Sequence, residues 1–548
     1  MEQYSTSESV DSTVNGRCDD DPPWLQALLS QPFVLPEHLT DAQLRSLTGE
    51  QLARLITRRK EMTPEEFRWR QAPPRDNSLP LSDITNATRF ILDHGASVRY
   101  CHAWKTWLVW TGTHWERDTT GRVIEWAKES MCRQALSALE LDDELRFKAA
   151  VKHAKSSMNA GRIESFLKLA QSMPTIPVAP EALDTYPWLL NCPNGVLDLR
   201  TGVLVPPDPA LYLTKCLPIP YDASAECPTW DQFLWRAMGG ITTPEGDRMS
   251  SEELTERGRV NERCALLVAY LQRAVGYALT GSTREQCLFV LHGPTKTGKS
   301  TFLGMIHGML GAYAQATAME TFMSKEQSTN TNDLAALAGS RYVCALEGET
   351  NKRFSEALVK RITGGMDGLT VRFLFEEFFT FRPTFKVFLG TNHKPVIRDS
   401  DSAIWERIRL VPFIVEIPLD ERDKDLEEKL ATEFPGMLAW AVRGCLRWQQ
   451  EDSLAEPPQV VAATKQYRHE MDEVGWFLDE MCTIGEDYLK TQSSTLLEAF
   501  HTWSGHKWMT HRVFTEYLTK KGYEQKRFKT GMFWQKIGLS KDYQETRY

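Results

Sequence analysis

The alternation of hydrophobic and polar residues along the chain predicts several domains around a central α/β core. Between Gln286 and Ile417, short apolar runs alternate with helical segments, which is typical of a parallel sheet with helices between its strands. Ahead of this region, Trp107–Trp115 and Leu189–Leu204 contain strand-like runs around turn signals, whereas residues 121–173 have helical spacing. The C-terminal region is predicted to be mainly helical. The pattern therefore indicates a multidomain α+β protein.

Changes in composition divide the chain into five predicted segments. Residues 1–25 carry six acidic residues against one basic residue and little apolar surface, which predicts a solvated segment. Residues 72–78 have the composition of a linker. The predicted segments are a disordered acidic tail (1–25), a helical N-terminal segment with its linker (26–78), an α+β domain (79–250), the central core (251–420) and a C-terminal region (421–548).

Charge, hydropathy and cysteine content exclude several classes of protein. The 548 residues carry a net charge of −9, so any nucleic-acid contact must come from local basic patches. No apolar run is long enough to span a bilayer, and the N-terminus lacks the pattern of a secretory signal. The eleven cysteines include no C-x-x-C pair, which is typical of reduced thiols. We therefore expect a cytoplasmic protein with no membrane partner.

A phosphate-binding loop is the most specific motif in the chain. Residues 293–300 match G-x-x-x-x-G-K-[ST], with a predicted strand before them and a predicted helix after them. Glycines let backbone N–H groups encircle phosphates, Lys299 neutralises phosphate oxygens, and the Ser300 hydroxyl holds Mg²⁺. The predicted nucleotide-binding residues are Gly293, Pro294, Thr295, Lys296, Thr297, Gly298, Lys299, Ser300 and Thr301.

Acidic, amide and basic side chains follow the loop in an order that suggests hydrolysis. An apolar strand ends in Glu347 and Glu349, which would hold Mg²⁺ together with Ser300 and polarise the attacking water. Asn392 follows a second apolar strand and could orient that water. Arg407 and Arg409 are candidates for an arginine finger. The sequence does not decide which of the two acids or which of the two arginines has the main role.

The run from Leu288 to Pro412 resembles superfamily 3 helicases, of the type found in phage and plasmid primase-helicases and their poxvirus relatives. The resemblance is carried by GPTKTGKST, RYVCALEGE, LGTNHKP and AIWERIRLVPF, with NGVLDLRTG, CPTWDQFL and VGYALTG upstream, and it covers roughly residues 80–548. It implies an AAA+-like ATPase core that uses ATP and Mg²⁺, with Glu347 and Glu349 as the acid site, Asn392 as sensor and Arg407 as the finger.

The same resemblance implies how the protein works and where. It implies a homo-oligomeric ring, a hexamer, that moves 3′→5′ on single-stranded DNA while replicating a phage, plasmid or mobile element in a bacterial cytoplasm. Only about 80 residues precede the helicase-associated region, so we expect no primer synthesis by this chain. A separate primase or polymerase is then a possible partner.

The family also places a DNA-tracking hairpin in the central channel, and residues 364–386 occupy that position. Its predicted strands are Val371–Phe375 and Phe378–Phe381, with Glu376 and Glu377 at the tip. A DNA-contacting tip is expected to carry a base, so this chain departs from the family pattern. The DNA-binding candidates here are therefore Arg372 and Lys386.

Basic residues are concentrated at the C-terminus. Residues 501–548 carry a net charge of +6, with a predicted helix over Thr510–Lys520 and a predicted wing over Gly522–Gly531. A winged-helix-like module of this kind could bind single-stranded or replication-origin DNA, whereas the alternative is a solvated basic face. The candidate DNA-binding residues are Arg512, Lys520, Lys521, Lys526, Arg527 and Lys529.

Two other functions remain open from the sequence. A P-loop kinase or small-molecule NTPase predicts no stimulation by DNA, and an origin-binding initiator predicts ATP use without strand separation. The helicase is favoured because Asn392 and the pair Arg407 and Arg409 follow the acidic strand in the order of a motor.

Overall fold

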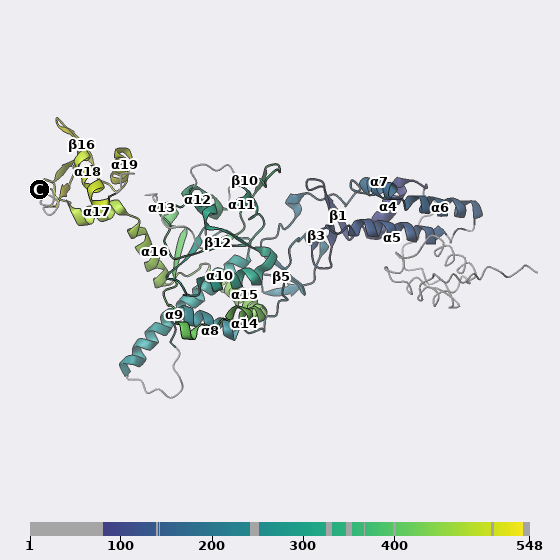
Figure 1. The fold of residues 1–548 in the computed structure, drawn as a ribbon, viewed down its shortest axis with the longest axis horizontal. Coiled ribbons are helices and arrows are strands. Elements are labelled where there is room, and N and C mark those ends of the chain that lie inside the picture. Colours follow the sequence, from purple (N-terminus) through teal and green to yellow (C-terminus); the bar gives the residue numbers. More distant parts are fainter. Residues whose placement is uncertain are drawn as a thin grey trace, which may run out of the picture. The chain divides into compact units, whose positions relative to one another are not determined.

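The computed structural model describes residues 80–138, 141, 143–241, 251–324, 331–346, 353–365, 368–397, 402–505 and 509–540 (Figure 1). The chain divides into two compact units. One consists of the residues up to Thr111 together with Trp115–Leu183, and the other of Gly112–His114 and the residues from Asp184 onward. The predicted tail (1–25) and helical N-terminal segment (26–78) lie outside the described residues.

The first unit packs helices against a small antiparallel sheet. The sheet has the order β1-β2-β3, and the predicted strands around the Thr111-Gly112 turn are β2 and β3. Phe90 and Phe166 are fully buried between the helices. The elements are α4 (Asp83–His94), β1 (Val98–Cys101), β2 (Thr106–Trp110), β3 (Trp115–Arg117), α5 (Arg122–Ser137), α6 (Glu144–Ser157) and α7 (Ala160–Ala170).

A second antiparallel sheet opens the second unit, and two helices follow it. The predicted turn signals Asn194-Gly195 and Thr201-Gly202 fall at the two hairpins of this sheet. None of the described helices, the long α9 included, is apolar enough over a sufficient length to cross a membrane. The elements are β4 (Leu189–Cys192), β5 (Gly195–Asp198), β6 (Val203–Val205), α8 (Pro228–Ala237) and α9 (Ser251–Leu279).

The centre of the second unit is a five-stranded parallel sheet with the order β13-β7-β12-β9-β8. This confirms the predicted α/β core. The strands are β7 (Leu288–His292), β8 (Ala314–Ala318), β9 (Tyr342–Leu346), β12 (Lys386–Thr391) and β13 (Ile408–Pro412). The helices between them are α10 (Lys299–Leu310), α11 (Asn332–Ala335), α12 (Glu356–Gly364) and α13 (Ser402–Trp405).

Both faces of this sheet are buried, which explains the continuous apolar runs in the sequence. Along β7, Phe289 and Leu291 enter one hydrophobic core, whereas Leu288 and Val290 enter the other. Side chains alternate between the faces of a strand, so a strand covered on both sides needs apolar residues at successive positions. Phe289 also stacks on Phe388 of β12, with ring centroids 4.4 Å apart.

A short hairpin is inserted between α12 and β12. Its strands are β10 (Leu369–Val371) and β11 (Phe379–Phe381), paired antiparallel. The hairpin occupies the predicted position, but the prediction of a first strand over Val371–Phe375 was wrong, because β10 ends at Val371. The seven residues 372–378 therefore form the connection between the strands.

The helices α9 and α15 (Phe434–Glu451) are in close contact, and both belong to the hydrophobic core on one face of the sheet. A Cβ on Gly276 would lie 2.1 Å from the backbone nitrogen of Cys445, and a Cβ on Gly444 would lie 2.0 Å from the carbonyl oxygen of Gln272. Real side chains do not approach that closely, so the crossing requires glycine in both helices. Trp448 of α15 is fully buried and its ring lies 4.8 Å from that of Tyr277.

The C-terminal region contains more strands than the sequence suggested. Two helices, α14 (Leu426–Thr432) and α16 (Pro458–Glu470), flank α15 in the chain. Beyond them, two antiparallel sheets have the orders β15-β17-β16 and β14-β18. Their elements are α17 (Glu473–Met481), β14 (Cys482–Ile484), β15 (Lys490–Gln492), α18 (Ser493–Ser504), α19 (His511–Lys520), β16 (Gln525–Phe528), β17 (Gly531–Gln535) and β18 (Ile537–Leu539).

Candidate nucleotide-binding site

The G-x-x-x-x-G-K-S motif forms the turn between β7 and α10. Gly298 has φ +88° and lies directly before the first residue of α10. A Cβ on Gly293 would lie 1.7 Å from the carbonyl oxygen of Phe413, so no side chain fits there. Lys296 also has a positive φ, and its carbonyl oxygen accepts a hydrogen bond from the backbone N–H of Ile417. The segment after β13 therefore holds the loop in its curved form.

The ammonium group of Lys299 lies inside this curve. Lys299 is buried, and its Nζ donates to the carbonyl oxygens of Gly293 (2.9 Å) and Pro294 (2.5 Å) and to the hydroxyl of Thr297 (3.2 Å). Ser300 is exposed in the first turn of α10. Phosphate binding requires positive charge and hydrogen-bond donors. Here the ammonium group of Lys299 supplies the charge, and the loop and the N-terminus of α10 supply backbone N–H groups. The residues present therefore fit a nucleotide phosphate.

The sheet order brings Asn392 next to this loop. Thr391 of β12 pairs with His292 of β7, so Asn392 and Gly293 each directly follow paired residues. On its other side β12 pairs with β9, where Gly390 faces Leu346. Glu347 and Glu349 lie outside the described residues, and Glu347 is the residue after the end of β9 in the sequence.

His292 is a site residue that the sequence analysis missed. It is half-buried at the carboxyl end of β7. Burial, followed by the positive charges of Lys394 and Lys299, lowers the pKa of its imidazole below the ordinary value, so the ring is neutral at pH 7. A polar residue directly before the first glycine of the loop was the signal that could have identified it.

The loop after Asn392 is anchored to α16. Lys394 forms an ion pair with Glu470 at 2.6 Å, and the hydroxyl of Tyr467 donates to the carbonyl oxygen of Pro395. Tyr467 is fully buried against Trp405. The helix that leads to the C-terminal elements therefore rests directly on the candidate sensor loop.

Arg407 and Arg409 lie at the opposite end of the sheet from the loop. Arg407 directly precedes β13, whose first residue, Ile408, pairs with Leu288 at the start of β7. At about 3.3 Å per residue, the length of β7 separates this end from the loop by about 13 Å. Arg407 Nη1 donates to the carbonyl oxygen of Ala403 (2.7 Å), whereas Arg409 forms an ion pair with Glu456. Neither arginine is brought to the loop of its own chain.

Lys386 is not placed to contact DNA, and that prediction is corrected. Only 2% of the residue is exposed, and its Nζ donates to the carbonyl oxygens of Thr280, Ser282 and Thr384. Burial, followed by the charge of Arg341, lowers the pKa of Lys386 well below the usual value of a lysine. Its role is structural, because it satisfies carbonyl groups at and just beyond the C-terminal end of α9.

Replacing Lys386 by Ala is therefore expected to destabilise the protein. The change leaves three carbonyl oxygens without their donor in a buried site, so the free energy of unfolding should fall by about 2–4 kcal/mol. Denaturant unfolding measures this. The exposed Arg382 provides a matched control, since Arg382→Ala should change the stability by less than about 0.5 kcal/mol. Equal stability of both variants would contradict the structural role of Lys386.

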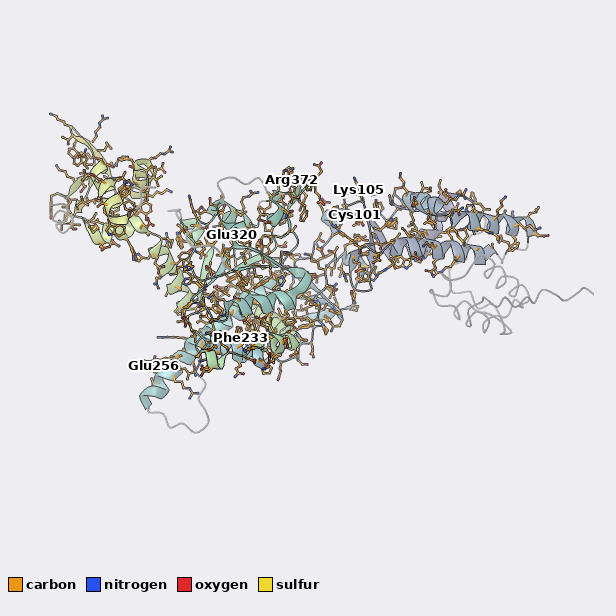
Figure 2. The ribbon with its side chains drawn as sticks, viewed as in Figure 1. Cys101, Lys105, Phe233, Glu256, Glu320 and Arg372 are labelled. Carbon is orange, nitrogen blue, oxygen red and sulfur yellow. The ribbon has the colours of Figure 1, made fainter. Side chains whose placement is uncertain are left out.

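Arg372 is exposed, as a DNA contact requires. It directly follows β10 and is labelled in Figure 2. Its guanidinium lies 4.7 Å from the ring centroid of Phe378. Its backbone N–H donates to the hydroxyl of Thr331 at 2.9 Å. Glu376 and Glu377 are also exposed.

The basic residues of the C-terminal region differ in how far they are neutralised. Arg512 pairs with Glu516 on α19, and Lys521 pairs with Asp472 at 2.6 Å. Lys520 is exposed at the end of α19. In the part of the chain that the structure describes, no ion pair involves the three exposed cations of the β16–β17 hairpin, which are Lys526, Arg527 and Lys529.

Two family models match the chain. Residues 87–239 match "D5 N terminal like", and residues 291–407 match "Family of unknown function (DUF5906)". The second match begins at the end of β7 and includes the phosphate-binding loop, Asn392 and Arg407.

Curated viral proteins are similar to the same regions. "Putative helicase L207/L206" of Acanthamoeba polyphaga mimivirus is 24% identical over 309 residues, which cover 53% of this chain and 30% of that protein. "Putative helicase 022R" of Frog virus 3 is 26% identical over 43% of this chain and 26% of that protein. "Primase D5" of Fowlpox virus is 23% identical over 42% and 28%, respectively. The chain thus spans less than a third of the length of these relatives.

Among solved structures, the apo form of the NrS-1 C-terminal region matches with a TM-score of 0.42 and 9% identity, covering 84% of this chain and 99% of that chain. The relationship of the chain to known proteins therefore rests on the sequence matches. The chain is homologous to these viral helicase and primase proteins, and its residues 87–239, ahead of the phosphate-binding loop, match the D5 N terminal like model.

Proposed function

We propose that the chain is an ATP-dependent DNA helicase of superfamily 3 that acts as a ring. The observation that carries the proposal is the division of the candidate residues between the two ends of one parallel sheet. The phosphate-binding loop and Asn392 lie side by side at the carboxyl ends of β7 and β12, whereas Arg407 lies at the amino end of β13. A site built this way is completed by a second subunit.

The nucleotide of this proposal is ATP with Mg²⁺. Lys299 and the backbone N–H groups of Gly293 and residues 295–301 would hold the phosphates, and Ser300 with Glu347 would hold the metal, which neutralises charge on the phosphate oxygens. Glu349 is the second candidate acid. Asn392 would orient the attacking water from the neighbouring strand.

The ring follows from the position of the arginines. Arg407 cannot reach its own loop across the length of β7, so it would act on the nucleotide of the adjacent subunit. Arg409 is held by Glu456 of its own chain, which favours Arg407 as the finger. The superfamily forms hexamers, and a closed ring is the arrangement in which each subunit supplies one loop and one finger.

The proposed ligand is DNA. The names of the viral relatives, helicase and primase, support this. The C-terminal elements α18, α19 and the β16–β17 hairpin follow the order of a winged helix, and Lys526, Arg527 and Lys529 would contact phosphates from its wing. Arg512, Lys520 and Lys521 are secondary candidates, since Arg512 and Lys521 are paired with Glu516 and Asp472.

The proposed setting is replication of a phage, plasmid or other mobile element in a bacterial cytoplasm, with 3′→5′ movement and a separate primase or polymerase. An origin-binding initiator that does not separate strands is the alternative, and the exposed cations of the hairpin support it equally well. A small-molecule kinase is disfavoured, because such an enzyme needs its arginine within reach of its own loop.

A strand-displacement assay with the wild-type chain tests the proposal. A forked duplex with a labelled strand should be separated with ATP but not with a non-hydrolysable analogue, and single-stranded DNA should raise ATP hydrolysis several-fold. A duplex with a 3′ single-stranded tail should be preferred over one with a 5′ tail. Origin binding without displacement would support the initiator, and hydrolysis insensitive to DNA would contradict both.

A further inference from the structure

The helix α4 of the first unit is apolar on the side that faces solvent. Leu81, just before the helix, is 42% exposed, and Ile84 and Leu92 within it are 64% and 72% exposed. Thr88 and Ile91, which are half-buried, complete the same side, because these positions follow one another at the helical spacing of three or four residues. We call these five residues the α4 stripe. None of them is charged.

Several polar residues of α4 face inward instead. Thr85 and Asn86 are buried, and the side-chain nitrogen of Asn86 donates to the hydroxyl of Ser157 on α6 at 3.0 Å. Arg89 is also buried. An ordinary surface helix directs its apolar residues to the core and its charged residues to water. Because the outer side of α4 has the reverse composition, we expect the α4 stripe to be covered by another element.

The sequence ahead of α4 contains an apolar helical pattern of matching length. Thr48 and Gln51 form the capping-box pattern T-x-x-Q, and Leu47 and Leu52 occupy the positions of a hydrophobic staple, which together predict the start of a helix. A helix over residues 49–59 would be about 16 Å long, close to the length of α4, about 18 Å. The apolar residues on one face of this predicted helix are Leu52, Leu55 and Ile56.

The connection to α4 allows this segment to fold back. From Arg59 to Leu81 the chain spans up to about 70 Å when extended, several times the length of α4. A tethered segment has an effective concentration in about the millimolar range, so a small apolar contact is enough to hold it. Another apolar run, Trp24–Leu29, is bounded by Pro23 and Pro32, so a helix there is limited to about 12 Å and is shorter than α4.

The size of the α4 stripe disfavours a second copy of the chain as its occupant. A stable interface between two proteins takes about 20–30 residues from each partner, whereas the stripe has five. The neighbouring helix α7 does not extend the apolar surface, because Arg162, Glu164 and Lys168 are exposed on it. A patch this narrow suits a single helix of the same chain.

We propose that residues 48–59 form a helix that packs lengthwise on the α4 stripe of the same chain. Leu52, Leu55 and Ile56 would then contact the stripe, and α4 would be covered on both sides. The match to the D5 N terminal like model begins at residue 87, so the docked segment lies outside the matched region. The inference is independent of the proposed function, because neither nucleotide nor DNA takes part in the contact.

Hydrogen–deuterium exchange of the full chain, read by mass spectrometry, tests the proposal. The backbone amides of residues 48–59 should exchange at least about tenfold more slowly than in a synthetic peptide of the same sequence. Leu92→Asp places a charge on the α4 stripe and should return the exchange of this segment to the rate of the peptide. Leu145→Asp is the matched control, since Leu145 is an exposed leucine on α6 outside the stripe, and it should keep the wild-type protection.

The amides of α5 and α7 report whether the first unit is still folded, and they should keep their protection in Leu92→Asp. Ile84→Asp repeats the test at the other end of the α4 stripe. The inference is overturned if the wild-type segment exchanges like the peptide, or if both stripe variants keep its protection. Protection that disappears on dilution would assign the contact to a second copy. Unfolding of α5 and α7 in both variants would show that the stripe supports the core, which also contradicts the proposal.

Discussion

Replacing Lys299 by Ala is expected to lower the rate of ATP hydrolysis by about a hundredfold or more. The ammonium group is buried within the loop and held by the carbonyl oxygens of Gly293 and Pro294. In the presence of ATP it would face the phosphate oxygens instead, and no other described lysine is buried in this loop. Phosphate release at saturating ATP measures the effect.

Two controls separate a loss of chemistry from a loss of fold. Lys424 is exposed, and Lys424→Ala should hydrolyse ATP at the wild-type rate. Lys299→Ala loses the hydrogen bonds of the ammonium group within the loop, so its melting temperature should fall, but it should still unfold in one cooperative thermal transition above the temperature of the assay. A Lys299→Ala variant that retains most of the wild-type rate would show that the loop between β7 and α10 is not the hydrolytic site.

Replacing Arg407 by Ala is expected to lower the hydrolysis rate by about a thousandfold with little change in nucleotide affinity. The reason is geometric, since the residue lies at the end of the sheet away from its own loop and would act only on the transition state in a neighbouring subunit. Steady-state hydrolysis and binding of a fluorescent ATP analogue separate the two quantities.

Mixing the two inactive variants gives the sharper test. In a mixed ring of Lys299→Ala and Arg407→Ala subunits, about one interface in four joins an intact loop to an intact arginine, so hydrolysis should partly return. Arg409→Ala is the comparison, because Arg409 pairs with Glu456 in its own chain. That variant should lose stability rather than hydrolysis. No recovery at any mixing ratio would contradict a site shared between subunits.

The sequence predicted the central sheet and its loop for physical reasons that the structure makes plain. A parallel strand covered on both faces needs successive apolar residues, and Leu288–Leu291 meet this requirement in both cores. The loop is predictable because Gly293 and Gly298 are required by contacts and dihedral angles within a few residues. Such local requirements leave a visible pattern in the sequence.

Features that depend on distant contacts were missed. Lys386 was predicted to contact DNA because the sequence does not reveal its partners: the carbonyl oxygens of Thr280 and Ser282 lie about a hundred residues earlier in the chain and are ordinary backbone groups. The sequence predicted only that Glu376 and Glu377 lie in the connection between the strands of the inserted hairpin. No sequence pattern indicates that Phe375, in the same connection, adopts a positive φ. The strand Gln525–Phe528 lacks apolar alternation because most of its side chains are exposed.

The contacts between the Asn392 loop and α16 have a mechanical consequence. Lys394 and Pro395 are bound to Glu470 and Tyr467, near the last turn of a 13-residue helix about 20 Å long. A helix of this length is stiff, so under the proposed function a small displacement of the loop on release of phosphate would tilt α16 as a whole. The elements that follow Glu470 would then report the chemical state of the nucleotide without touching it.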